Sequence, residues 1–175
     1  DVNQRYLTNL NRMEDTLKMQ ESTVAGSIEL VSRIKELSIQ GANDTYSASD
    51  RKTMAIEVKE LIRALADLGN MRGTDGAYLF SGYSQGQAPF SESSTGAVTY
   101  TGSADSLKVM VDDGRRMQLG ISGADIFGSV EHLNTGTGAT SRIDLFASLN
   151  SMHEALVTND GDAIRNNVDK VSSVH

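Results

Sequence analysis

The first forty residues carry the longest regular pattern of apolar and polar positions in the chain. Large apolar side chains recur there at steps of three, four and seven residues, the spacing that lines one face of an α-helix. These apolar positions are Tyr6, Leu10, Met13, Leu17, Val24, Ile28, Val31, Ile34 and Leu37. Gly41 and Asn43 then supply a stop signal. The pattern predicts a helix over residues 5–40, which is roughly 50 Å long at ~1.5 Å per residue.

A helix of this length cannot bury its apolar stripe alone, so it needs a partner along its whole length. We therefore expect a coiled coil or an elongated helical bundle. Gln20, Ser27 and Ser38 interrupt the apolar seam, which predicts looser packing than in a strict leucine zipper.

A second amphipathic helix is predicted over residues 50–68, with Ser49 or Asp50 as its N-cap. It should fold back antiparallel on the end of the first helix, because the connection between them is short. The second helix covers only part of the first, so the residues around 6–17 must find another partner. The side chains that we expect to pack this helical shaft are Leu10, Leu17, Val31, Ile34, Val58, Leu61, Leu65 and Leu68.

From Gly69 the sequence changes to glycine-rich segments with alternating apolar positions, which is typical of short strands. Residues 77–80 form the first such segment. Three further alternating segments follow at Val98 and Tyr100, at residues 107–111 and at residues 117–121. The sequence Asp112–Asp113–Gly114 between the last two is a hairpin turn signal. Residues 73–139 are therefore predicted to be a small antiparallel β-rich surface domain.

Helical spacing returns over residues 141–157 and again over residues 162–175. The apolar face of the last predicted helix suits the uncovered half of the first. Residues 1–72 and 140–175 would then form one helical shaft domain, with the β-rich domain inserted between them. The fold class that follows is α+β, an elongated helical bundle with an inserted small antiparallel β domain.

Composition excludes several kinds of partner and site. The 175 residues carry a net charge of −7, so the chain lacks the basic face that nucleic acids require. The absence of Cys excludes disulfides, thiolate catalysis and Cys-ligated metals. No apolar run approaches the ~18 residues of a membrane span, so we expect no membrane association. The chain begins with Asp1 and ends inside a helical pattern, and we interpret it as a fragment.

Motifs for catalysis or cofactor binding are incomplete. Ser122 lies in Gly-Ile-Ser-Gly, which falls short of the nucleophile elbow G-x-S-x-G. Residues 136–138 open neither a Walker loop nor a dinucleotide-binding loop, and residues 160–162 lack the further ligands of a calcium loop. The histidines lack metal-ligand spacing: they are His132, His153 and His175. We expect no catalytic residue, no cofactor and no metal, and hence no enzyme.

Several stretches resemble the flagellin family. Residues 33–45 (RIKELSIQGANDT) resemble the end of the family's long first core helix, and residues 49–51 and 56–58 resemble the start of its second. Gly41 and Gly69 stand where the family more often has alanine. A more discriminating stretch is DGAYLFSG, which resembles the hook–filament junction branch of the family; flagellins tend to have a Phe-Asn-Gly turn there. Its motif residues are Tyr78, Leu79, Phe80 and Gly82. The same branch resembles this chain at residues 89–90, 100–102 and 123–127.

The resemblance implies an extracellular structural protein of the bacterial flagellum, secreted through the flagellar export apparatus. It would join the hook to the flagellin filament by subunit packing. The implied partners are neighbouring copies of itself, hook-associated protein 1, flagellin and an export chaperone. The family's polymerising terminal segments are missing here, so we expect this chain by itself to be monomeric. The alternatives are a flagellin proper or a secreted binding module or adhesin, which an exposed pocket of converging polar groups in the β-rich domain would favour.

Overall fold

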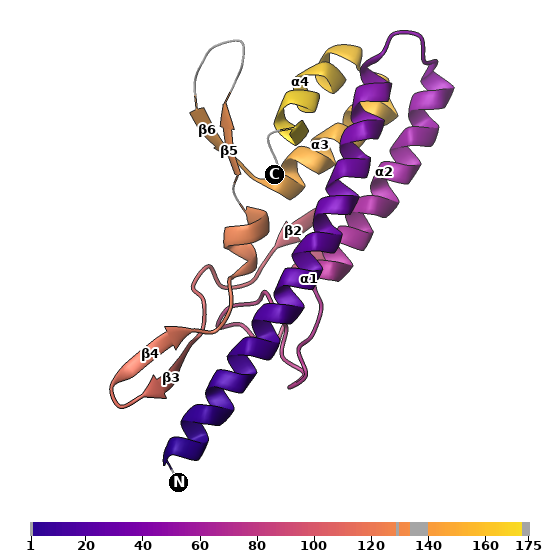
Figure 1. Ribbon diagram of the computed structural model, residues 1–175. Coiled ribbons are helices and arrows are strands. Elements are labelled where there is room, and N and C mark those ends of the chain that lie inside the picture. Colours follow the sequence, from indigo (N-terminus) through magenta and orange to yellow (C-terminus); the bar gives the residue numbers. More distant parts are fainter. Residues whose placement is uncertain (1, 129, 134–139, 173–175) are drawn as a thin grey trace.

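The molecule is a rod built on one long helix. Its computed structural model describes residues 2–128, 130–133 and 140–172, and it describes the strands within 130–143 by their backbone alone. Helix α1 (Val2–Ala42) runs the length of the rod, and α2 (Ala48–Gly69) returns antiparallel beside it (Figure 1). Helices α3 (Leu145–Thr158) and α4 (Gly161–Ser172) pack on the same end of the rod as the α1–α2 turn. The predicted α+β class and long first helix are confirmed.

The ends of α2 and α3 are fixed by caps that the sequence pattern placed only approximately. Ser47, not Ser49 or Asp50, caps α2: its Oγ accepts from the Asp50 N–H at 3.2 Å, and the Asp50 carboxylate accepts from the Ser47 N–H at 2.9 Å. This reciprocal pair is a capping box. Asp144 caps α3 by accepting from the Ala147 N–H at 2.7 Å. The predicted helix start at residue 141 is therefore wrong, because the cap places the first turn after Asp144.

Within the described residues, the strands form three separate two-stranded antiparallel sheets. They pair β1 (Phe90–Glu92) with β2 (Val98–Tyr100), β3 (Lys108–Asp112) with β4 (Arg115–Gln118), and β5 (Val130–Leu133) with β6 (Thr140–Ile143). A short π-helix, η1 (Ala124–Gly128), precedes β5.

Two of the predicted β features have different outcomes. The turn at Asp113–Gly114 is confirmed, and Gly114 adopts the positive φ of 71° that such a turn requires. The predicted strand over residues 77–80 is wrong: only Tyr78 makes an isolated bridge, to Arg72. The turn at Gly76, with φ of 78°, folds the chain back on itself and leaves residues 79–80 without a neighbouring strand.

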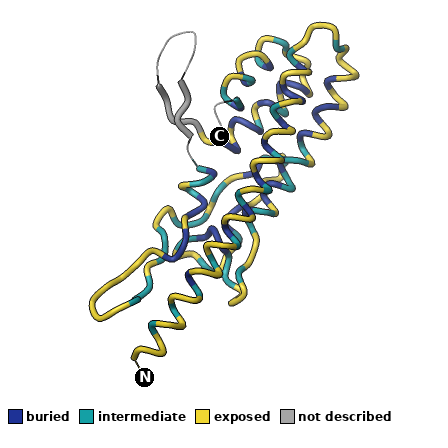
Figure 2. Tube along the Cα trace, viewed as in Figure 1, coloured by how far each residue is buried: buried dark blue, intermediate teal, exposed yellow. Residues whose placement is uncertain are grey.

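A single hydrophobic core joins the helices to the β-rich region. Figure 2 shows buried residues concentrated where α2 and α4 pack on α1 and α3 packs on α2 and α4, whereas the first turns of α1 are mainly exposed. The core continues out of the bundle through an aromatic cluster, in which the Phe90 ring lies 5.2 Å from Phe127 and 5.1 Å from Phe146. This packing fixes the β-rich region against the shaft. The division into domains at residues 72/73 and 139/140 stays a prediction.

Candidate functional site

The two halves of helix α1 bury different kinds of side chain. Its second half buries apolar side chains, among them Val31 and Ile34, against α2 and α4. Its first half buries fewer side chains, and one of them is polar: Gln20, which is 3% exposed. The residues predicted to interrupt the seam therefore lie on the packed face: they are Gln20, Ser27 and Ser38. Their polar groups are hydrogen-bonded, as buried polar groups must be.

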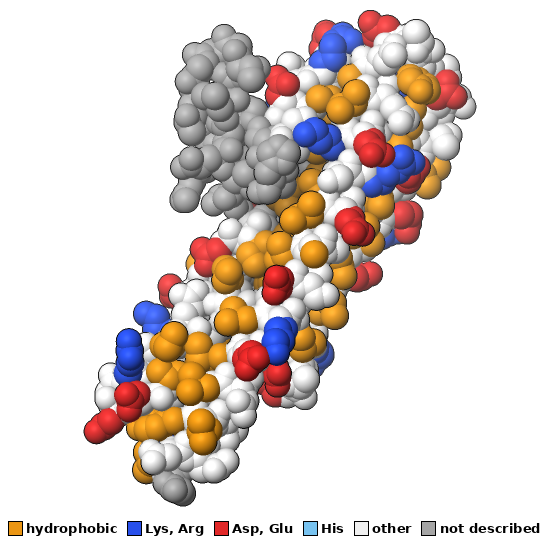
Figure 3. Space-filling model, viewed as in Figure 1, with side chains coloured by type: hydrophobic (Ala, Val, Ile, Leu, Met, Phe, Trp, Pro, Cys, Tyr) orange, Lys and Arg blue, Asp and Glu red, His pale blue; other side chains and the backbone are white. Residues whose placement is uncertain are grey.

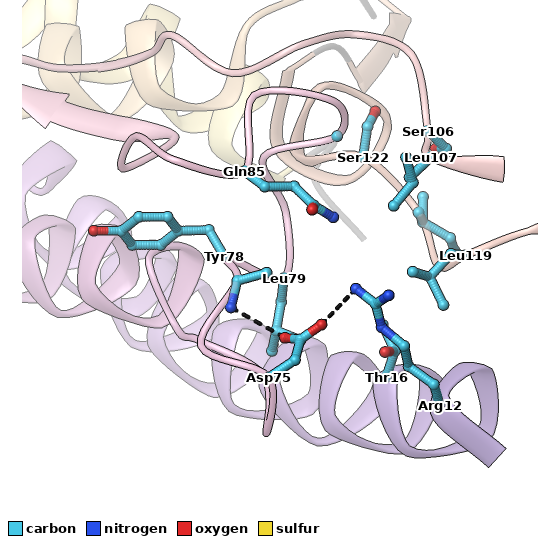
Figure 4. Close-up of a pocket in the computed structure, with 13 residues that line it drawn as sticks. Arg12, Thr16, Asp75, Tyr78, Leu79, Gln85, Ser106, Leu107, Leu119 and Ser122 are labelled. Carbon is cyan, nitrogen blue, oxygen red and sulfur yellow. Dashed lines mark hydrogen bonds and ion pairs between the residues drawn. The ribbon is translucent and has the colours of Figure 1, made fainter. Parts of the chain in front are cut away.

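Polar side chains on the first half of α1 hold the β-rich region. Asn9 Nδ2 donates to the Met110 carbonyl in β3 at 2.6 Å, and Gln20 Nε2 donates to the Leu79 carbonyl at 2.7 Å. The Arg12 guanidinium forms an ion pair with Asp75, and Figure 4 shows the two side chains pointing toward each other across a small pocket. Hydrogen bonds and charge thus position this region on the shaft.

Apolar side chains along one side of α1 face the solvent. Leu10, Leu17 and Ile28 are 42%, 45% and 55% exposed. The predicted burial of Leu10 and Leu17 inside the bundle is wrong. The physical reason is the drift of about 20° per heptad between a seven-residue repeat and a straight helix. Leu10 lies three heptads before the buried Val31. Over these three heptads the side-chain direction turns by about 60°, which carries Leu10 toward the solvent.

We call Leu10, Leu17 and Ile28 the exposed stripe. In Figure 3 hydrophobic side chains gather on the visible face along α1 and beside the β3–β4 hairpin. Met117 in β4 and Ile121 after it are also exposed, at 46% and 44%. A series of apolar side chains on one face is typical of a protein–protein contact surface.

The remaining predicted shaft residues form the core. Val31, Ile34, Val58 and Leu65 are buried. Leu61 and Leu68 are half-buried, and Leu61 packs against the core from its edge. Leu61 lies three residues after Val58 and four before Leu65. At 100° per residue it points about 60° and 40° away from these two buried side chains, toward the edge of the packed face.

The motif residues 78–82 connect the two parts of the molecule. Phe80 is fully buried, and its ring packs edge-on against Phe127 at 5.6 Å. Leu79 is buried beside it, and Tyr78 stacks under the Arg72 guanidinium at 4.1 Å from the ring centre. Gly82 has φ of 60°, and a Cβ there would meet the Asp105 carbonyl. The role of this motif is therefore packing and chain reversal.

Ser122, the hydroxyl weighed as a nucleophile, has a structural partner. Ser122 Oγ donates to Asp125 Oδ2 at 2.9 Å and accepts from the Asp125 N–H, so it caps η1. Burial lowers the pKa of His153, and Lys59 lowers it further. The side chain of His132, and His175 altogether, lie outside the described residues. Among the residues whose side chains are described, no group of three or more His, Asp or Glu could hold a metal ion.

An open hollow of about 490 Å³ lies beside the β3–β4 hairpin. Its polar lining includes Tyr83, Asp105, Lys108 and Asp125. Carboxylates and an ammonium group share it, so its charge is mixed.

Across the part of the chain that the structure describes, no helix is both long and apolar enough to cross a membrane.

Comparison with known proteins places this geometry among flagellar proteins. Residues 3–85 match the bacterial flagellin N-terminal helical region. The flagellar hook-associated protein 3 of Escherichia coli strain K12 is 32% identical over 149 residues, which cover 84% of this chain and 46% of that protein. The protein of the same name in Salmonella typhimurium is 29% identical over 144 residues, or 81% of this chain and 44% of that protein. This chain thus spans less than half the length of either relative.

The fold has a close counterpart among solved structures. The crystal structure of FlgL from Xanthomonas campestris superposes with a TM-score of 0.77 at 22% identity, covering 99% of this chain and 85% of that one. The likeness at this identity concerns the fold: a long helix, a short antiparallel companion and small sheets held at its side.

Proposed function

Because this chain belongs to the flagellin family, we propose that it is part of a structural protein that joins the hook of a bacterial flagellum to its filament. The similarity to two hook-associated proteins 3 over more than four-fifths of the chain supports this assignment. The motif at residues 78–82 supports it too, because the resemblance of that stretch is to the junction branch and not to flagellin. The working place of the protein would be outside the cell, after passage through the flagellar export apparatus.

The observation that carries the proposal is the exposed stripe. A monomeric soluble helix gains nothing from Leu10, Leu17 and Ile28 in water, whereas burying one such side chain contributes about 1.5–3 kcal/mol. Residues 1–72 carry 10 basic and 11 acidic side chains, so like shafts would not repel one another strongly. The shafts of neighbouring copies would therefore pack side by side along this stripe. Contacts with hook-associated protein 1, flagellin and an export chaperone complete the proposed partners.

The proposed mechanism is packing and involves no catalysis. The hydroxyl that came nearest to a nucleophile motif, on Ser122, is committed to capping η1. The related proteins are structural components of flagella by name. We infer no cofactor and no enzyme activity.

The experiment replaces Leu10 and Leu17 with Asp in the full-length gene, in a strain that lacks its own copy. The control is Asn11→Asp, which adds one negative charge at an exposed position about 100° around α1 from Leu10. We expect the double variant to fold with an unchanged melting temperature, yet to give hooks without filaments and flagellin in the medium. The control should swim. Normal filaments on the double variant would contradict the proposal.

Flagellin proper is the second candidate, because the matched N-terminal helical region is shared with it. Complementation separates the two: a junction protein restores filaments only to a strain lacking the junction, and a flagellin only to a strain lacking the filament subunit. The hollow beside Tyr83 is a feature that would favour a binding module. Its mixed charge and open shape give that candidate little support.

A further inference from the structure

Three aspartates of the chain are followed directly by glycine, a sequence that permits a backbone rearrangement without any enzyme. The three pairs are Asp75–Gly76, Asp113–Gly114 and Asp160–Gly161. Glycine has no side chain to shield its backbone nitrogen, so this nitrogen can reach the side-chain carboxyl carbon of the preceding aspartate. In a folded protein, the contacts of each pair decide whether the two groups meet.

The reaction releases one water molecule and then consumes one. The glycine nitrogen attacks the carboxyl carbon of the protonated aspartate and gives up its proton, the carboxyl hydroxyl leaves as water, and a five-membered succinimide ring forms. Water then opens the ring. Breaking the bond from nitrogen to Cγ restores aspartate, whereas breaking the bond from nitrogen to the backbone carbonyl carbon gives isoaspartate, in which the main chain runs through Cβ and Cγ.

The first pair is held by bonds that oppose this attack. The Asp75 carboxylate forms an ion pair with Arg12 and also accepts from the Ala77 N–H at 3.0 Å. The Gly76 N–H donates to the Gly73 carbonyl at 2.9 Å. An ionised and bound carboxylate is a poor target for a nitrogen nucleophile, and the Gly76 nitrogen is directed toward another acceptor. The fold therefore protects Asp75.

The third pair is held by helix α4. Asp160 Oδ1 accepts from the Ala163 N–H at 3.0 Å, and Gly161 is the first residue of the helix. A helix N-terminus stabilises a negatively charged carboxylate, whereas the attack requires the neutral acid. The Asp160 side chain is therefore both bound and kept in its less reactive form.

The second pair lies in the turn of the β3–β4 hairpin, which projects from the side of the rod (Figure 1) and is exposed at its tip (Figure 2). Among the described residues, the Asp113 carboxylate has no hydrogen-bond or ionic partner, and the Gly114 N–H has no acceptor. Asp113 is fixed only through its own N–H, which donates to Asp112 Oδ1 at 2.8 Å. These contacts leave both reacting groups unbound.

We propose that Asp113 is a site of spontaneous isoaspartate formation, and that the fold protects Asp75 and Asp160 from the same reaction. The reaction uses only this chain and water, so it does not rest on the proposed junction role. Isoaspartate adds one carbon atom to the main chain within a two-residue turn. The adjoining pairing of Asp112 with Arg115 would then be lost, and the hairpin would loosen at its tip.

The first test follows oxygen from the solvent. The folded chain is incubated for weeks at neutral pH in heavy-oxygen water, because each opening of the ring leaves one heavy oxygen in the carboxylate that forms. Cleavage after Lys and Arg in ordinary water then separates the three pairs into peptides 73–108, 109–115 and 143–165. Mass spectrometry should show at least several-fold faster labelling of peptide 109–115 than of the other two. Equal labelling of the three peptides, or faster labelling of either other peptide, would overturn the proposal.

The same incubation in concentrated urea separates the effect of the fold from that of the local sequence. Unfolding removes the contacts of Asp75 and Asp160, so the three labelling rates should converge. If peptide 109–115 led by the same factor in urea, the local sequence would set the ranking and the proposed protection by the fold would be wrong.

The second test uses two hairpin variants. Asp113→Glu would require a six-membered ring, so labelling of peptide 109–115 should fall to background. Asp112→Glu is the matched control, since it keeps the charge of the hairpin and the Asp113–Gly114 pair, and it should be labelled like the native chain. An isoaspartate methyltransferase should methylate this peptide in the aged native chain and not in aged Asp113→Glu. Methylation of both, or of neither, would contradict the assignment of isoaspartate to Asp113.

Discussion

The side-chain amide of Gln20 binds both backbone groups of Ile121. Gln20 Nε2 donates to the Ile121 carbonyl at 2.9 Å, and Gln20 Oε1 accepts from the Ile121 N–H at 2.9 Å. The pair resembles one rung of an antiparallel sheet, formed between residues 101 positions apart. Gly120, with φ of 76°, brings this backbone close to the helix, and a Cβ there would clash with the Gln20 amide. This side chain therefore fixes where the β-rich region sits on α1.

We expect Gln20→Met to destabilise the protein by about 1–3 kcal/mol, although methionine is similar in size. The substitution leaves the buried Leu79 carbonyl and both groups of Ile121 without their partner. Urea unfolding measures the loss, and hydrogen exchange at the Ile121 amide should accelerate. Gln40→Met, at an exposed position of the same helix, is the control and should change neither quantity. Equal behaviour of the two variants would show that the Gln20 amide does not hold this contact.

Leu65 and Leu61 should differ although both lie on α2. Leu65 is fully buried in the core, so Leu65→Ala should cost about 2–5 kcal/mol. Leu61 is half-buried at the edge of the core, and Leu61→Ala should cost clearly less. Thermal unfolding of the two variants tests the order. A larger loss for Leu61→Ala would mean that the core is centred differently on this helix.

Gly69 and Gly26 should respond in opposite directions to replacement by alanine. A Cβ at Gly69 would collide with the ring of Phe90, which is 3% exposed and held by its aromatic neighbours, so Gly69→Ala should destabilise by about 1–3 kcal/mol. A Cβ at Gly26 would meet only Leu68 Cδ1 at 3.4 Å, an ordinary contact. Gly26→Ala should therefore stabilise by up to about 1 kcal/mol through helix propensity. Chemical denaturation of each variant gives the sign.

His153 should make stability depend on pH below neutrality. Burial and Lys59 lower the pKa of His153 in the folded state below its usual value of 6.5. As the pH falls below about 6.5, the unfolded chain binds this proton first. The stability that uncharged His153 contributes to the folded state is thus fully present above that pH. It is lost as the pH falls through the pKa of His153 in the folded state. As the pH is lowered from 7.5 to 5.5, the melting temperature should fall more steeply for the native chain than for His153→Asn. Parallel curves would contradict the assignment of this pH dependence to His153.

The sequence by itself determined the helices and the class of the fold. Repeats of three and four residues identify α1 and α2, because an amphipathic helix must place its apolar side chains on one face. The turn at Asp113–Gly114 was also readable, since a tight hairpin needs a residue that tolerates positive φ. The motif at residues 78–82 indicates the family from the sequence alone. The packing role of its residues, such as Phe80 against Phe127, is visible only in the structure.

Only the tertiary structure decided which face of α1 is buried. Leu10 and Gln20 both lie in a helical pattern, and hydrophobicity favours burying the leucine. The leucine is exposed and the glutamine is buried, because the neighbour of this half of α1 is a set of loop carbonyls and N–H groups that need polar partners. The glycines at 41 and 69 are explained in the same way: a methyl group at Gly41 would lie 2.5 Å from Leu156 Cδ2, and one at Gly69 would meet Phe90. These partners come from distant parts of the chain, and local periodicity carries no information about them.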